Sequence, residues 1–88
     1  MAQFTGMDIE AVRSLAQQMN SSAEEIRNLA SRLSSALEGT QWVGPDREKF
    51  VGDWQGQYMT SLNQVAQGLV DAAQRATANA SEQETASS

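Results

Sequence analysis

Apolar residues recur at helical spacing through the first half of the chain. Three parallel rows with a seven-residue repeat run along this segment, so its apolar face is broader than a two-row coiled-coil seam. The rows are Val12, Met19, Ile26 and Leu33; Leu15, Ser22, Leu29 and Ala36; and Ala16, Ala23, Ala30 and Leu37. Asp8 suits the N-cap, and Gly39 suits the position just past the end. We therefore predict a helix over 8–38.

A second helix is predicted over 45–79. Pro45 suits its first position, where the missing N–H has no helical partner, and Gly44 suits the N-cap. Asp46 and Glu48 place negative charge at the positive end of the helix dipole. Apolar residues then recur in steps of three and four, which indicates a helix. They are Phe50 or Val51, Trp54, Tyr58, Leu62, Val65, Leu69, Ala72 or Ala73, and Ala76.

Glycines interrupt this second helix and weaken it by up to about 1 kcal/mol each relative to alanine. Gly52 and Gly56 lie one turn apart, and two interpretations of the pair stay open. Either packing against the first helix tolerates them, or they allow another backbone to approach closely. The neighbouring Asp53, Gln55 and Gln57 exclude a membrane setting for such an approach.

The short segment 39–44 between the helices predicts an all-α, antiparallel helix-turn-helix hairpin. Each helix has an apolar face wider than one contact seam, so we expect a second hairpin to cover the remainder, giving a four-helix bundle dimer. The alternative is a marginal monomer that orders on meeting a partner. The residues expected in the core and dimer interface are Val12, Leu15, Met19, Ile26, Leu29, Leu33, Leu37, Phe50, Trp54, Tyr58, Leu62, Val65 and Leu69.

The two ends of the chain differ from this body, which covers 8–79. Residues 1–7 are expected to form a flexible arm. Residues 80–88 contain no large apolar side chain and are expected to form a disordered tail.

The amino-acid composition excludes most kinds of catalytic and metal-binding site. The chain has no cysteine and no histidine, which excludes a Ser-His-Asp arrangement and the usual zinc ligands. Lys49, the only lysine, lies beside Glu48 and is expected to be solvated. We therefore expect no catalytic residues, no metal site, no cofactor and no enzymatic activity.

Charge and hydropathy bear on partners and location. Eleven acidic against six basic residues give a net charge of -5, which opposes binding to nucleic acid and anionic membranes. No run approaches the roughly 20 apolar residues of a membrane span, and stable membrane insertion is not expected. The N-terminal segment has neither the basic region nor the apolar run of a signal peptide. These features predict a cytoplasmic protein or one exported by another route.

The triplet Trp42-Val43-Gly44, placed between two amphipathic helices, resembles the WXG family (WXG-100), the small ESAT-like proteins of type VII secretion. The resemblance covers about 8–76, and Phe50 and Trp54 look like the aromatic positions common there. It implies a hairpin that pairs antiparallel with another WXG-type protein after folding in the cytoplasm. It also implies export as a folded dimer, without a signal peptide, through recognition by the secretion ATPase.

One departure from the family pattern concerns the tail. The family often carries Tyr-x-x-x-Asp/Glu just after the second helix, forming a composite signal with the partner's Trp-x-Gly. Here Tyr58 is followed four residues later by Leu62, and the tail offers Glu82 and Glu84 but no aromatic residue. The resemblance then implies a second signal supplied by the partner, which favours a heterodimer over a homodimer.

Two other functions are compatible with the sequence. One is a purely structural dimerisation module in which Trp42 packs over the last turn of the first helix. The other is a membrane-active amphipathic effector, which the acidic charge and alanine-rich faces disfavour. For Trp42 and Gly44 the functional alternative is a recognition surface shared with a partner's tail.

Overall fold

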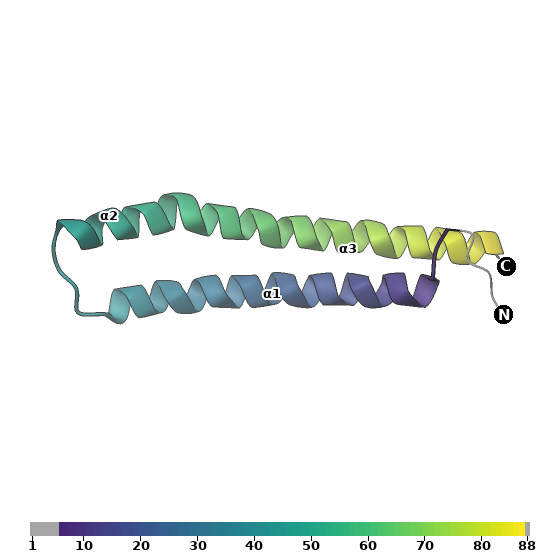
Figure 1. The fold of residues 1–88 in the computed structure, drawn as a ribbon, viewed down its shortest axis with the longest axis horizontal. Coiled ribbons are helices and arrows are strands. Elements are labelled where there is room, and N and C mark those ends of the chain that lie inside the picture. The colour runs from purple at the N-terminus through teal and green to yellow at the C-terminus, as the bar shows by residue number, and fades with distance from the viewer. Residues whose placement is uncertain (1–5, 88) are drawn as a thin grey trace.

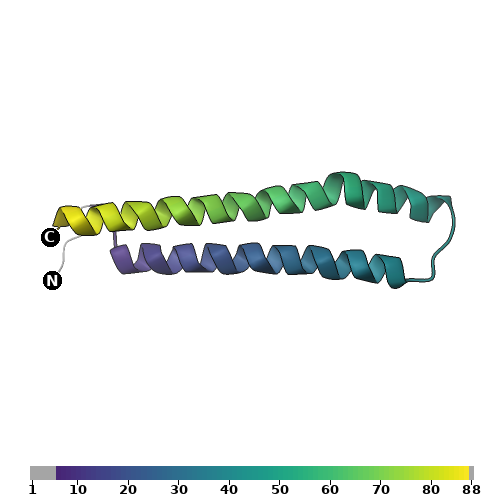
Figure 2. The same ribbon diagram turned by 180° about the vertical axis from the view of Figure 1, so that it is seen from behind.

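The computed structural model describes residues 6–87 and shows a helical hairpin (Figure 1). α1 spans Ile9–Gly39, and the second arm consists of α2 (Pro45–Asp53), the π-helical turn η1 (Trp54–Tyr58) and α3 (Met59–Ser87). The second arm is a single bent rod lying antiparallel to α1, and the hairpin measures 64 × 17 × 15 Å (Figures 1 and 2). The predicted all-α hairpin is confirmed for the single chain, whereas the predicted second helix is interrupted by η1.

The helix ends largely follow the predicted caps. The Asp8 carboxylate accepts a hydrogen bond from the backbone N–H of Ala11 at 3.2 Å. α2 begins at Pro45 after Gly44, with acidic residues in its first turn. Gly39 differs from the expectation, because it is the last residue of α1 and Thr40 is the C-cap. The Thr40 hydroxyl donates to the Ala36 carbonyl at 2.6 Å, which satisfies one of the terminal acceptors.

The buried core is a seam of alanines between α1 and α3. Six alanines are at most 3% exposed, and no larger side chain of the described residues is fully buried. They are Ala16, Ala23 and Ala30 on α1, and Ala66, Ala73 and Ala80 on α3. In the single hairpin, the large apolar residues expected at the core and dimer interface therefore lie beside the fully buried positions, not at them. Two helices approach most closely along a row of small side chains, and the larger residues beside that row are left to flank the contact.

The two sides of the alanine seam differ in polarity. On a helix, residues three and four positions after a seam alanine flank the seam on opposite sides. The four-position row of α1 contains Arg27, which donates to Gln67 at 3.2 Å, and the equivalent Arg13 binds Glu84. These contacts place the polar rows of both helices on one face, here called the polar face. The apolar rows therefore share the opposite face, here called the apolar face, which includes Leu15, Ile26, Leu29, Leu33, Tyr58, Leu62, Val65 and Leu69.

The C-terminal segment also differs from the sequence-based expectation. α3 continues to Ser87, through most of the region 80–88 expected to be disordered. Ala80 extends the alanine seam, and the Arg13 guanidinium forms two hydrogen bonds with the Glu84 carboxylate, at 2.9 and 3.2 Å. These contacts tie the end of α3 to the start of α1. The expected arm over 1–7 lies outside the described residues except for Gly6 and Met7, which precede α1 without regular structure.

Enlarging a seam alanine is expected to destabilise the hairpin. Ala23 is 1% exposed, so leucine there must push α1 and α3 apart, and overpacking of this kind typically costs about 1–3 kcal/mol. Ala78→Leu, on the exposed side of α3, serves as the matched control and is expected to change stability little. Thermal unfolding followed by circular dichroism at equal protein concentrations compares the two. Equal melting temperatures would contradict the seam as the core.

Acid is expected to loosen the C-terminal end of α3. The hydrogen bonds and charge of Arg13 lower the pKa of Glu84 below its ordinary value of 4.5. A lowered folded-state pKa means that the pair stabilises this end above pH 4.5, and that the contribution is lost as the pH falls through the lowered pKa. Amide exchange at 80–87 measures the change. Glu84→Gln should show the faster exchange already at pH 7, and unchanged exchange in that variant would contradict the tie.

Candidate functional site

The Trp-x-Gly turn presents its three residues in different ways. Val43 is 96% exposed, and Trp42 is 38% exposed. Gly44 has φ 135° and ψ 177°, a backbone conformation that is almost restricted to glycine. No atom lies within 4 Å of the position a Cβ would take at Gly44, so backbone conformation rather than space requires this glycine.

Trp42 lies against its own hairpin. Its ring centroid is 5.8 Å from that of Phe50 on α2, and the planes are inclined by 51°, a favourable arrangement for an aromatic pair. Together with Trp54 and the last turns of α1, these rings surround an open cavity of about 310 Å³. We call this region the Trp42 corner. Its lining residues are Leu33, Ala36, Leu37, Thr40, Trp42, Phe50 and Trp54.

The Trp54 indole N–H and two hydroxyl groups around the Trp42 corner are engaged within the chain. The Trp54 indole N–H donates to the Ser34 hydroxyl at 2.8 Å, and that hydroxyl donates to the Ala30 carbonyl at 2.9 Å. The Met59 sulfur lies 3.6 Å from the same hydroxyl. The Thr40 hydroxyl is bonded to α1, as described above. The cavity therefore offers an apolar surface with a fixed indole as one wall.

The apolar face continues from the Trp42 corner along the hairpin. Large side chains remain 41–54% exposed on it, a degree of exposure that their size makes costly in water. They are Leu15, Leu29, Leu33, Phe50, Tyr58 and Val65. The Tyr58 ring lies 6.4 Å from that of Trp54, which joins the face to the corner.

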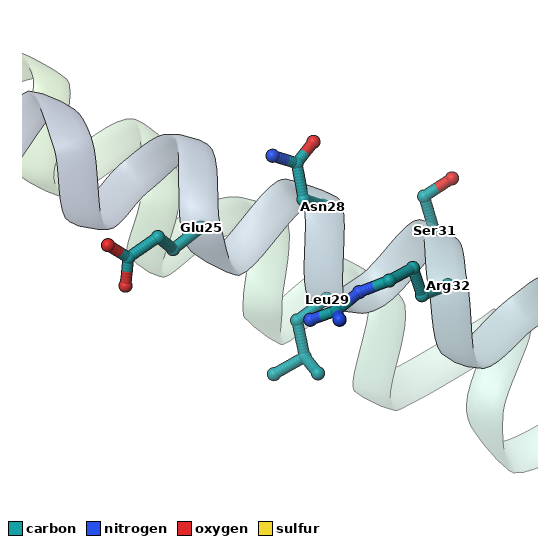
Figure 3. A pocket seen from close by; sticks show the side chains of 5 residues that line it. All are labelled: Glu25, Asn28, Leu29, Ser31 and Arg32. Atoms are coloured by element: carbon teal, nitrogen blue, oxygen red, sulfur yellow. The ribbon is translucent and has the colours of Figure 1, made fainter.

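A second hollow lies on the outer surface of α1 and is lined by Glu25, Asn28, Leu29, Ser31 and Arg32 (Figure 3). The Arg32 side chain lies toward Leu29, while Asn28 and Ser31 point the other way (Figure 3). Because all of these residues belong to a single helix, they enclose no site where a small molecule would be held from several sides. The hollow is an ordinary feature of a helix surface.

Two kinds of feature, a cluster of metal ligands and a membrane-spanning helix, are not found among the described residues. Residues 6–87 contain no cluster of three or more potential ligands among histidine, cysteine, aspartate and glutamate. None of the helices over that range combines the length and the hydropathy that a bilayer span requires.

The structure brings only part of the predicted core and interface set together. Residues that flank the alanine seam and are half-buried are Val12, Met19, Ile26, Leu37, Trp54, Leu62 and Leu69. Those that remain exposed are Leu15, Leu29, Leu33, Phe50, Tyr58 and Val65. Around Gly52 and Gly56, apart from the adjoining residues and the backbone of their own helix, no described atom lies within 4 Å of an added Cβ, so the backbone of α1 does not approach them closely.

Sequence reasoning missed Ser34 as the hydrogen-bond partner of Trp54, a residue of the Trp42 corner. Ser34 follows Arg27 by seven residues in the polar row beside the alanines. A small hydroxyl in a row otherwise held by long or charged side chains was the available signal, because a half-buried donor or acceptor needs a partner.

Comparisons with protein-family models, curated proteins and solved structures give no match for this chain.

Replacing Gly44 by alanine is expected to cost about 1–3 kcal/mol, because a side chain there is held in a strained backbone conformation. Gly52→Ala is the control: it also has open space, but it lies in a helix, where alanine is favoured by up to about 1 kcal/mol. Chemical unfolding should thus show opposite signs for the two variants. A stability of Gly44→Ala equal to that of the parent would contradict the assigned turn geometry.

Proposed function

We propose that this chain is a small, non-enzymatic substrate or co-substrate of type VII secretion, exported as a folded dimer that the secretion ATPase recognises. The observation that supports this best is the combination of a Trp-x-Gly turn with an uncovered apolar face on one hairpin. Exposed apolar patches of this kind mark protein-interaction surfaces. A partner hairpin would cover this face, and the Trp42 corner adjoins the face at the turn end of the hairpin.

The proposed partner of the apolar face is a second WXG-type hairpin. Its own apolar face would cover Leu29, Tyr58 and Val65 and complete a four-helix bundle. Full burial of a leucine or valine side chain stabilises by roughly 1.5–3 kcal/mol, whereas burial of an alanine methyl contributes only about 0.8 kcal/mol. Since the core of the single hairpin is made of alanine, pairing supplies much of the stability that the large side chains can give.

A heterodimer is favoured over a homodimer in this proposal. Tyr58 lies within η1, ahead of α3, and residues 76–87 contain no aromatic residue to form a Tyr-x-x-x-Asp/Glu signal. Glu84, an acidic residue in the expected region, is bound to Arg13 of the same chain. The tyrosine-bearing signal would come from the partner. Export would follow folding in the cytoplasm and would need no signal peptide.

A purely structural dimerisation module is the second candidate, and one contact favours it. Trp42 packs on Phe50 and forms one wall of the open cavity beside the last turns of α1. That contact stabilises the corner whether or not another protein binds there.

Replacing Trp42 by alanine separates the two candidates in cells that carry a type VII machine and a tyrosine-bearing WXG-type partner. We expect Trp42→Ala to keep its helicity and its pairing, because the alanine seam and most of the apolar face are untouched. Export into the medium should fall at least about tenfold, as for loss of a contact worth about 1.4 kcal/mol. Sedimentation velocity measures pairing, and immunoblotting of the medium measures export.

Val43→Ala is the control for that experiment, because Val43 is 96% exposed and its loss leaves the indole in place. Parental export of Trp42→Ala would favour the structural module. A parent chain that stays monomeric at micromolar concentration with the partner present would overturn the proposed pairing. Should the alanine variant unfold, Trp42→Leu keeps the cavity wall apolar and tests recognition again.

A further inference from the structure

The half-buried and buried positions of the second arm change their spacing at η1. Within α3 all of them except Val70 and Ala72 follow two rows with a strict seven-residue repeat, but each row steps by eight residues across the π-helical turn. The first row is Val51, Met59, Ala66, Ala73 and Ala80, and the second is Trp54, Leu62, Leu69, Ala76 and Gln83. The turn therefore contains one residue more than the repeat of the seam requires.

The backbone shows how the extra residue is accommodated. The N–H of Met59 donates to the carbonyl of Trp54, five residues earlier, instead of the usual four. Each residue of an α-helix turns the chain by about 100°. One added residue at η1 thus rotates the whole of α2 by about 100° relative to α3, compared with an uninterrupted helix.

An uninterrupted helix would give a different Trp42 corner. Counting back seven residues from Met59 would place Gly52 in the seam, where Val51 now lies. Trp54 would then lie two residues past the seam, about 200° around the helix and facing solvent. With the extra residue, the Trp54 indole instead reaches Ser34 at 2.8 Å and forms a wall of the cavity.

We infer that η1 is a one-residue insertion that sets the rotation of α2, and that Trp54 and Ser34 are positioning residues for Trp42. The hydrogen bond between them holds α2 in this rotation, and α2 carries Phe50, whose ring contacts Trp42. Only the functional value of the corner rests on the proposed export. The rotation itself rests on the spacing and on the contacts.

Deleting one residue from η1 tests the insertion. A deletion inside a helix ordinarily rotates everything on one side of it, but removing Gln55 should convert η1 into α-helix and leave every row aligned. We expect ΔGln55 to keep its helical content and to melt within about 4 °C of the parent, or above it. The matched control is ΔGln74, another exposed glutamine, which breaks the repeat between Ala73 and Ala80 and should lower the melting temperature by more than about 8 °C. Equal losses in the two variants would overturn the inference.

Fluorine NMR of the chain labelled with 5-fluorotryptophan tests the positioning role. Ser34→Ala removes the acceptor of the Trp54 N–H, and we expect both indole signals to move, although Ser34 lies outside the set of residues lining the cavity. Ser34→Thr keeps the hydroxyl and should restore both signals. A Trp42 signal that stays unchanged in Ser34→Ala would overturn the role assigned to Ser34.

Export gives a separate readout. In a strain that exports the parent, ΔGln55 should be exported at the parental level, and Ser34→Ala should be exported less, with recovery in Ser34→Thr. If the parent itself is not exported, the proposed function fails, while the melting temperatures and fluorine spectra still decide the inference on η1.

Discussion

Close contact between two rows of alanine is the constraint on which the rest of this hairpin depends. At the six buried alanine positions a methyl group is the largest side chain between α1 and α3, so the two helices lie together there along a line too narrow for leucine, valine or tryptophan. Most of the large apolar residues are displaced to one side of the seam, and Arg13 and Arg27 lie on the other. The same narrow contact thus produces the small core, the exposed apolar face and the polar face that ties the helices together.

Much of the fold was readable in the sequence, and the failures have physical causes. Helical spacing, the N-cap at Asp8 and the Gly44-Pro45 start of the second arm predicted both arms, because these signals are local. The alanines appeared as one apolar row among three, and only the tertiary contact decides which row becomes the core. The tail was expected to be disordered because it lacks large apolar residues, yet a seam that accepts only methyl groups needs none.

The π-helical turn is visible in the sequence as an irregular spacing of apolar residues, but this spacing alone does not identify a π-helical turn. Phe50, Trp54, Tyr58 and Leu62 follow one another in three steps of four. Twelve residues are about one more than three turns of an α-helix contain. Steps of three and of four residues both fit an α-helix, so the extra residue does not stand out in the sequence pattern. In three dimensions the extra residue decides which side chains face α1. Val51 takes the position that Gly52 would have in an uninterrupted helix, and Trp54 comes within hydrogen-bonding distance of Ser34.

A seven-residue repeat of alanine allows two helices to pack in several axial positions with the same contacts. Sliding α3 past α1 by one repeat would again set methyl against methyl, so the seam gives affinity without fixing the translation of the helices. That choice falls to the short turn and to contacts that occur once: Trp54 with Ser34 near the turn, Arg27 with Gln67 in the middle, and Arg13 with Glu84 at the open end. These polar contacts contribute little to the free energy of folding. Their role is to select one axial alignment of α1 and α3 among several that pack similarly.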